Sequence, residues 1–236
     1  MRLDKYLCEL NIGSRSQVKD YIRQGLITVN DTVATKPDIQ IKEECDSVTF
    51  RGQLLSYSKF QYFMLNKPEG VVSATQDNTA TTVLDLLGPK RPKGLFPVGR
   101  LDKDTTGLLI ITNDGELAHT MLSPKKHVDK TYLVEIEKPL TSASQQALEN
   151  GVDIGEERLT APAKVEVLNE REIYLTIHEG KFHQVKRMLQ AVDNRVLHLK
   201  RVRFGGLTLD ESLLPGESRV LTAQEVALIH EKSNHA

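Results

Sequence analysis

The sequence predicts an α+β protein, with a small α/β unit at the N-terminus and a larger body built on a mixed, mostly antiparallel sheet. Strand patterns outnumber helix patterns and occur in runs, which favours this class over a doubly wound parallel sheet. The 236 residues exceed one small domain and fall short of two full-sized ones. Apolar residues make up 39% and charged residues 27%, which is ordinary for a globular protein with a sizeable core.

The N-terminal unit, residues 1–57, is expected to hold two helices and two strands. Apolar residues recur at helical spacing at Leu3, Tyr6, Leu7 and Leu10. A capping-box pattern, Ser14-Arg-Ser-Gln17, opens a second helix, and Gly25 is a plausible end for it because glycine is favoured just past a helix. Strands are expected at 26–29 and 48–50.

The second helix has a row of cations. Arg15, Lys19 and Arg23 are four residues apart, so they form one stripe on one helical face, which Arg2 and Lys5 of the first helix can join. Stacked like charges repel by a few tenths of a kcal/mol per pair, and only a polyanion such as a phosphate backbone would offset this. A solubilising surface remains the alternative.

The larger body, residues 60–236, follows a short polar link at 56–59. Strands are predicted at 62–66, 71–74, 108–112, 131–137, 164–168, 172–178 and 196–199. Helices are predicted at 80–87, 115–122, 141–150, 183–191 and 222–231.

Several classes of protein are not expected. No apolar run approaches the ~18–20 residues of a membrane helix, and the charged N-terminus does not resemble a signal peptide. Cys8 and Cys45 have no metal-type spacing and are expected to be reduced thiols of a cytoplasmic protein. The seven histidines show no ligand spacing, and phosphate-loop and dinucleotide fingerprints are absent, so we expect no metal and no cofactor.

The charges are unevenly distributed although the net charge is −1. Residues 181–203 have seven Lys and Arg against one Asp, and residues 89–103 have five against one. Residues 205–231, by contrast, have five acidic residues against one Arg. Such segregation is typical of a protein with one basic face for a polyanion, with ordinary solvated surface as the alternative.

The segment Gly99-Arg-Leu-Asp-Lys-Asp-Thr-Thr-Gly107 has the most unusual chemistry. It is a charged loop followed at once by an apolar strand pattern, a common place for a catalytic group. A calcium loop fits its first half, but Asn113 stands where a bidentate Glu is needed. A structural ion pair between Arg100 and Asp104 is the other alternative.

Two further segments have candidate functional residues. In Lys130-Thr-Tyr132-Leu-Val134 the alternation places the lysine, the tyrosine and the valine on one face, where a tyrosine usually belongs to the core. In residues 179–189 an apolar helical stripe is expected at Phe182, Val185, Met188 and Leu189. Off this stripe, His183, Lys186 and Arg187 are the kind of residues that contact single-stranded or flipped-out nucleic acid.

Together these segments resemble the bacterial ribosomal pseudouridine synthases of the RsuA family. The matching motifs are Arg2-Leu-Asp-Lys5, Ser14-Arg15 with Gly25, Leu65-Asn-Lys-Pro-Glu-Gly70, Gly99-Arg-Leu-Asp102, Thr105-Thr-Gly107, Lys130-Thr-Tyr132, Glu179-Gly-x-x-His-Gln-Val-Lys-Arg-Met188 and Gly205-Gly-Leu207. Their order and spacing span nearly the whole chain. The first two motifs are similar to the small S4 RNA-binding domain, so the resemblance implies an S4-like domain at 1–57 and a catalytic domain at 60–236.

The resemblance also implies roles for individual residues. The catalytic set is Asp102 as the essential carboxylate, Tyr132 as the active-site tyrosine and Lys186 as the cation paired with the carboxylate. Leu207 is the implied apolar member packed under the site. The RNA-binding residues implied are Arg100, Arg2, Lys5, Arg15, Lys19, Arg23, His183 and Arg187. Whether the carboxylate attacks C1′, removes the 2′ proton or stabilises a cationic sugar stays open.

The reaction implied is isomerisation of a uridine to pseudouridine, which needs no cofactor. The chain resembles in particular the small-subunit members, which form pseudouridine 516 of 16S rRNA. The expected partner is therefore 16S rRNA or a small-subunit assembly intermediate, bound by a cytoplasmic monomer with no membrane contact. The alternatives are the same chemistry on 23S rRNA and a non-catalytic S4-type RNA-binding or ribosome-assembly factor.

Overall fold

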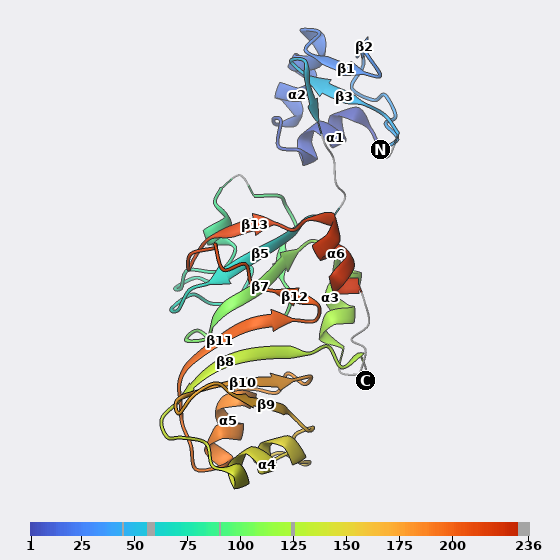
Figure 1. Cartoon of the computed structure of the whole chain (residues 1–236). Helices are drawn as coiled ribbons and strands as arrows, with labels where there is room; N and C mark the ends of the chain where they lie inside the picture. The colour runs from blue at the N-terminus through green and yellow to red at the C-terminus, as the bar shows by residue number, and fades with distance from the viewer. Residues whose placement is uncertain (44, 56–59, 90, 124–125, 231–236) are drawn as a thin grey trace. The chain divides into compact units, whose positions relative to one another are not determined.

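The computed structural model describes residues 1–43, 45–55, 60–89, 91–123 and 126–230. Contacts within the chain define two units (Figure 1), one of Met1–Gln61 with Pro89–Gly94 and one of Tyr62–Gly88 with Leu95–Ala236. The link predicted at 56–59 lies outside the described residues. Within the described ranges, no helix has the length and hydropathy to cross a membrane.

The first unit has two helices and a four-stranded antiparallel sheet of order β2-β1-β3-β4. The elements are α1 (Leu3–Glu9), α2 (Arg15–Arg23), β1 (Ile27–Val29), β2 (Thr32–Val33), β3 (Val48–Phe50) and β4 (Gln53–Leu55). The capping box is confirmed, because the Ser14 hydroxyl accepts from the Gln17 amide and the Gln17 side chain accepts from the Ser14 amide. Gly25 ends α2 with φ +70°.

The core of this unit combines the predicted helical faces with the sheet. Leu3, Tyr6 and Leu7 of α1 pack with Val18 and Ile22 of α2, and all five side chains are buried. The edge strands β2 and β4 were not predicted, because two or three residues are too few to show an alternating pattern.

The second unit is built on a nine-stranded mixed sheet. Its strands are β5 (Tyr62–Lys67), β6 (Phe96–Pro97), β7 (Thr106–Thr112), β8 (Lys130–Ile136), β9 (Lys164–Val167), β10 (Glu172–Ile177), β11 (Val196–Phe204), β12 (Leu207–Thr208) and β13 (Ser218–Val220). The main path is β13-β5-β7-β11-β8-β10-β9, with β6 beside β7 and β12 beside β11. Among the described strand pairs only β7 and β11 run parallel, so the mostly antiparallel prediction is confirmed.

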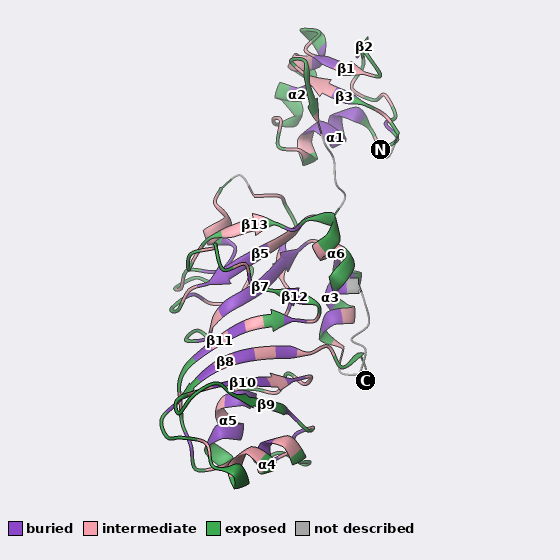
Figure 2. Cartoon of the chain, in the orientation of Figure 1, coloured by how far each residue is buried: buried purple, intermediate pink, exposed green. Residues whose placement is uncertain are grey.

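Helices cover the two faces of this sheet at different ends. They are η1 (a 3₁₀ turn, Asp85–Leu87), α3 (Gly115–Leu122), α4 (Ser142–Asn150), α5 (Gln184–Ala191) and α6 (Ala223–His230). Side chains of α4 and α5 join one buried cluster with β8, β10 and part of β7, whereas α3 and α6 join a second with the other face of β7. Figure 2 shows β7 buried along most of its length, between these two cores.

Two predicted elements are wrong. Residues 71–74 form no strand, since Val72 makes only an isolated bridge to Thr82. The helix predicted at 80–87 is reduced to η1, because the Asp85 carboxylate accepts from the Thr82 amide and hydroxyl, and Gly88 ends the turn with φ +78°. The strand predicted at 196–199 is longer, because β11 continues to Phe204 along its ladder with β8.

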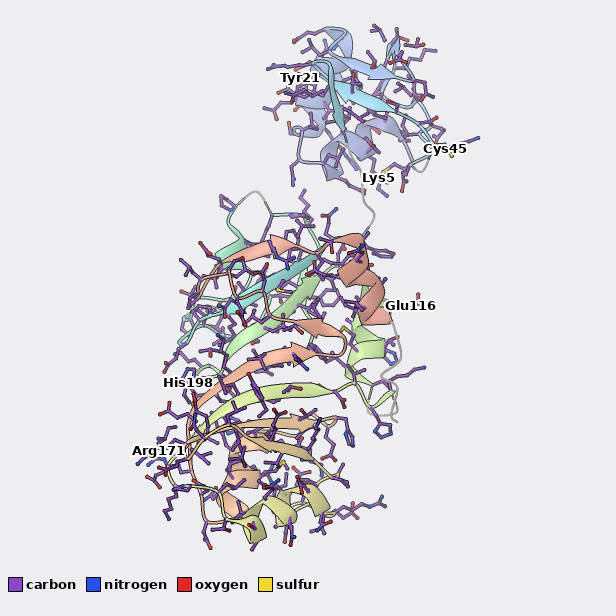
Figure 3. All side chains as sticks on the ribbon, in the orientation of Figure 1. Lys5, Tyr21, Cys45, Glu116, Arg171 and His198 are labelled. Carbon is purple, nitrogen blue, oxygen red and sulfur yellow. The ribbon has the colours of Figure 1, made fainter. Side chains whose placement is uncertain are left out.

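The other predicted elements of this unit are confirmed. The remaining helices match within a residue at each end, and position 231 of the last one lies outside the described residues. The strands β6, β12 and β13 were missed because each has only two or three residues. Side chains occupy both sides of the sheet in Figure 3, where Glu116 marks α3 and His198 marks the beginning of β11.

Candidate active site

The second unit has a cavity of about 660 Å³ on the sheet face that bears α5. Its wall comes from the loop 99–105, strands β8, β10 and β11, and the beginning of α5. Five lining residues are Lys or Arg and two are acidic: Arg100, Lys130, Lys181, Lys186 and Arg201 against Asp102 and Glu179. In the described part of the chain, no three potential metal ligands are clustered.

The loop between β6 and β7 places Asp102 at this cavity. Leu101 is buried, and its backbone amide and carbonyl both bond to the Ser73 hydroxyl, at 3.0 and 2.9 Å. The Asp102 carbonyl accepts from the Thr105 amide at 3.1 Å and closes a turn. Gly99 has φ +75°, a conformation in which any larger residue is strained, and a Cβ there would also push the Leu122 side chain, 2.8 Å away.

A buried lysine holds the same loop through hydrogen bonds to its backbone. Lys67, at the end of β5, is fully buried and donates from Nζ to the carbonyls of Pro68, Lys103 and Thr105 at 3.1, 3.3 and 2.8 Å. Burial lowers the pKa of Lys67 to about 8, opposed by the charges of Asp104 and Asp102. The ammonium therefore fixes the backbone on both sides of Asp104 without a direct ion pair.

Two side chains from the beginning of α5 approach the Asp102 carboxylate. Lys186 Nζ lies 3.6 Å from Oδ2, and His183 Nε2 lies 3.5 Å from Oδ1. Lys186 is closer to Asp104, at 2.6 Å, and this hydrogen bond lowers the pKa of the Asp104 carboxyl. Lys186 thus bridges two carboxylates, and no ion pair between Arg100 and Asp104 forms among the described residues.

The turn before α5 explains how these side chains reach the cavity. The Glu179 carboxylate accepts from the Gln184 side chain at 2.7 Å and from the Ala161 amide at 2.9 Å. His183 then takes a left-handed conformation, φ +48°, before the helix begins. The apolar stripe predicted for this helix is wrong at Phe182, which is 74% exposed and stacks on the His183 ring with centroids 3.8 Å apart.

Tyr132 lies where the cavity meets the core. The predicted alternation of β8 is confirmed, since Lys130, Tyr132 and Val134 are buried on one face. Tyr132 belongs to the core cluster of this face and also lines the cavity. Arg201 of β11 is its cross-strand partner in the ladder. The structure therefore brings Arg100, Asp102, Tyr132, His183 and Lys186 to one cavity.

Other predicted residues lie elsewhere. Leu207 does not line the cavity: it pairs with Phe204 and packs with that ring in the second core cluster, so its role under the site stays a prediction. Ile177 and Leu199 provide apolar lining instead. Arg187 donates to Glu156 at 2.9 Å and to the carbonyls of Phe182 and Ile154, which makes it a brace for that loop.

The basic residues predicted in the first unit are exposed, as expected. Arg15, Lys19 and Arg23 share one face of α2. Arg23 pairs with Asp20, Arg2 with Asp4 at 2.8 Å, and Lys5, labelled in Figure 3, with Glu9 at 3.6 Å. The sequence assigned no role to Lys67 or Lys130, although both stand in the quoted motifs, and Arg201 appeared only as one of the cations of residues 181–203.

Comparison with known proteins identifies the class to which this fold and cavity belong. The model of the RNA pseudouridylate synthase family matches residues 61–191, and the S4 domain model matches residues 1–48. The chain belongs to the RNA pseudouridylate synthase family and is an isomerase of that class with an S4 domain.

Individual relatives extend this similarity over the whole chain. An uncharacterized RNA pseudouridine synthase of Bacillus subtilis (strain 168) is 46% identical, over 98% of this chain and 99% of the relative. Ribosomal small subunit pseudouridine synthase A is 43% identical in Vibrio cholerae and 41% in Escherichia coli (strain K12), over 97% of this chain and 99% and 100% of those proteins. A crystal structure of a pseudouridylate synthase, 40% identical, superposes with a TM-score of 0.69 over 97% of this chain and 99% of that one.

Proposed function

We propose that this protein converts one uridine of small-subunit rRNA, at the position of nucleotide 516, to pseudouridine with Asp102 as the essential carboxylate. The observation that supports this most strongly is the rigid placement of Asp102. Its loop is pinned by Ser73 and Lys67, and its carboxylate faces a cavity large enough for a nucleotide. The full-length relatives named for the small subunit give the substrate class.

The chemistry requires a carboxylate next to the sugar. The N1–C1′ bond breaks, the uracil turns within the cavity, and C5 bonds to C1′; C5 then loses its proton and N1 gains one. The Asp102 carboxylate stabilises the positive charge that develops at C1′, as carboxylates do in glycoside hydrolysis. Lys186 Nζ and His183 Nε2, at 3.6 and 3.5 Å from its oxygens, hold the carboxylate in position.

The remaining cavity residues bind and order the nucleotide. Tyr132 contacts the uracil and assists removal of the C5 proton. Arg100 is exposed at the cavity and takes the place that the flipped uridine vacates in the RNA. His183 contacts the RNA next to the target, and the exposed ring of Phe182 supports it by stacking.

The two parts of the chain divide the work. Residues 1–57 form the S4-like RNA-binding domain, with Arg15, Lys19 and Arg23 on the phosphate backbone, and residues 60–236 form the catalytic domain. Arg2 and Lys5 extend the basic surface of α1, and Arg187 adds to the charge near the cavity. The protein acts as a cytoplasmic monomer on 16S rRNA or a small-subunit assembly intermediate.

Tritium release tests this proposal. Uridine labelled at C5 loses its tritium when pseudouridine forms, so the purified protein is incubated with labelled 16S rRNA, 23S rRNA and partly assembled small subunits. Release of one equivalent from the small-subunit substrates alone is expected, with the product mapped to nucleotide 516. Release from 23S rRNA alone contradicts the substrate, and binding without release from any RNA contradicts the enzyme assignment.

A further inference from the structure

Two buried cations form the floor of the cavity. Arg201 on β11 is 2% exposed and Lys130 on β8 is 8% exposed, and both line the cavity beside Tyr132. Both also lie over the Phe204 ring, with the Arg201 guanidinium carbon 4.5 Å and Lys130 Nζ 5.5 Å from its centroid. They are named here the cationic floor.

The cationic floor has no ion-paired counter-charge among the described residues, although the Asp129 carboxylate acts on Lys130 from a longer distance. Arg201 Nε donates to the Leu108 carbonyl at 2.8 Å, but Nη2 is buried and has no acceptor among the described residues. Lys130 Nζ donates to the Val128 carbonyl at 2.9 Å. Neither cation forms an ion pair with any carboxylate in the described part of the chain.

Burial of these two neighbouring cations is energetically unfavourable. Burial, together with the nearby Arg201 charge, lowers the pKa of Lys130 to about 8 against the opposing effect of Asp129, so the ammonium still holds its proton at neutral pH. Two like charges that are removed from water without an ion-paired counter-charge lose hydration and repel each other. A group that brings negative charge into the cavity offsets both costs, and it interacts strongly because the surroundings exclude water.

We propose that the cationic floor of Arg201 and Lys130 stabilises the negative charge of the uracil as it leaves the sugar. This role rests on the proposed function. When the N1–C1′ bond breaks, both electrons stay with the base, and the charge spreads over N1 and the carbonyl oxygens. When C5 bonds to C1′, N1 ends with a proton and C5 gives one up, so the floor's negative partner exists only between the two bond changes.

The timing of this charge predicts which kinetic quantity responds. The cationic floor stabilises a neutral uridine only slightly, whereas it stabilises the negatively charged departing base strongly. Loss of the floor is therefore expected to lower the rate of conversion and to leave RNA affinity nearly unchanged. Removal of one preorganised group that stabilises developing negative charge typically costs about 100-fold or more in rate.

The test uses single-turnover conversion of the target nucleoside in saturating RNA by Lys130→Met and Arg201→Met, read as loss of the original N-glycoside in nuclease digests. The RNA has uridine or 5-fluorouridine at the target. The fluorinated base is more acidic and leaves more easily, so it depends less on the floor. We expect about a 100-fold loss with uridine and less than about a 10-fold loss with 5-fluorouridine.

Lys200→Met is the matched control. It removes the same charge from the residue next to Arg201, but Lys200 lines a separate cavity of about 450 Å³ on the opposite sheet face. Its rates are expected within twofold of the parent with both RNAs. If Arg201→Met does not fold, as judged by circular dichroism, Lys130→Met decides the question, with Lys130→Arg expected to restore most of the rate.

Several outcomes overturn the inference. Equal losses with both target bases mean that the two cations only shape the cavity, and parent-like rates in Lys130→Met mean that the floor is not used. A loss in Lys200→Met equal to that in Lys130→Met shows a nonspecific effect of charge. A parent protein that converts neither base contradicts the proposed function itself, which distinguishes that failure from failure of the floor.

Discussion

The cations of α2 and the cations around Asp102 are organised in opposite ways. On α2, Arg15, Lys19 and Arg23 belong to one helix, are all exposed, and share a face because of their spacing alone. Around Asp102, Lys186 comes from a segment more than 80 residues away, and its Nζ lies within hydrogen-bond distance of a second carboxylate. The first group resembles a distributed electrostatic surface, whereas the second depends on individual distances.

This difference predicts how each region responds to substitution. A single change near Asp102 alters a geometry that no neighbour can replace, so its effect on turnover is large. A substitution on α2 removes one of several similar, solvent-exposed charges. It is therefore expected to lower RNA affinity rather than turnover, and this effect is weaker at high salt. Four substitutions or truncations, taken from the largest expected effect to the smallest, test this distinction.

Asp102→Asn is expected to lower turnover by about 10⁴-fold or more, because the amide has the shape of the carboxylate and lacks its charge. RNA affinity should stay within a few fold of the parent. Tritium release and a binding titration on the same RNA measure the two quantities. Asp104→Asn is the matched control, since Asp104 also pairs with Lys186 but is 61% exposed at its side chain. Substantial turnover by Asp102→Asn would remove the basis of the assignment.

Lys186→Met is expected to lower turnover roughly 100-fold, because it leaves both Asp102 and Asp104 without their shared cation. Lys186→Arg should recover only part of the rate, since a planar guanidinium cannot occupy the same point between two carboxylates. Turnover at saturating RNA measures the effect, and circular dichroism checks the fold. Full activity of Lys186→Met at pH 7 would mean that the cation is not needed beside Asp102.

A chain of residues 60–236 alone is expected to fold and to bind rRNA at least about tenfold more weakly than the whole protein. The expectation follows from the separate buried cores of the two units. Thermal unfolding and a binding titration measure the two effects. A fragment with no cooperative transition would contradict independent folding, and equal affinity would contradict the anchoring role of residues 1–57.

The sequence predicted short-range features of this molecule better than contacts between residues that are distant in the chain. The Ser14 capping box, the alternation of Lys130, Tyr132 and Val134, and most long elements follow from short-range patterns and are confirmed. The grouping of Asp102 with Lys186 followed from the family resemblance, because no periodicity relates positions so far apart.

The errors of prediction have physical causes as well. Leu207 was expected to pack under the site, and the β11–β12 hairpin instead keeps it out of the cavity wall by pairing it with Phe204. Phe182 fits a helical stripe in sequence, but α5 begins only at Gln184. The left-handed conformation of His183 before the helix leaves the Phe182 side chain exposed. Lys67 was known only as part of a motif, because its contacts are to backbone carbonyls distant in the chain.

The smallest effect is expected for the triple variant Arg15→Gln, Lys19→Gln and Arg23→Gln. If the stripe contacts phosphates, RNA binding weakens, and each lost contact lowers the log–log slope of affinity against salt by roughly 0.7 to 0.9. The loss should be similar for RNAs of different sequence, because phosphate contacts do not distinguish bases. The helix should persist, since Gln is a good helix former and the buried Val18 and Ile22 are unchanged.

A second triple variant separates position from net charge. Lys36→Gln, Lys42→Gln and Arg51→Gln remove three exposed cations from the same unit but not from α2. Titration of the parent and both variants at two salt concentrations is the measurement. A weaker, less salt-dependent affinity for the α2 variant alone locates the phosphate contacts on the stripe, with turnover at saturating RNA unchanged. Equal affinities and parallel slopes for all three proteins would instead make the stripe an ordinary solvated surface, and the comparison between the two groups of cations would then reduce to a difference in burial.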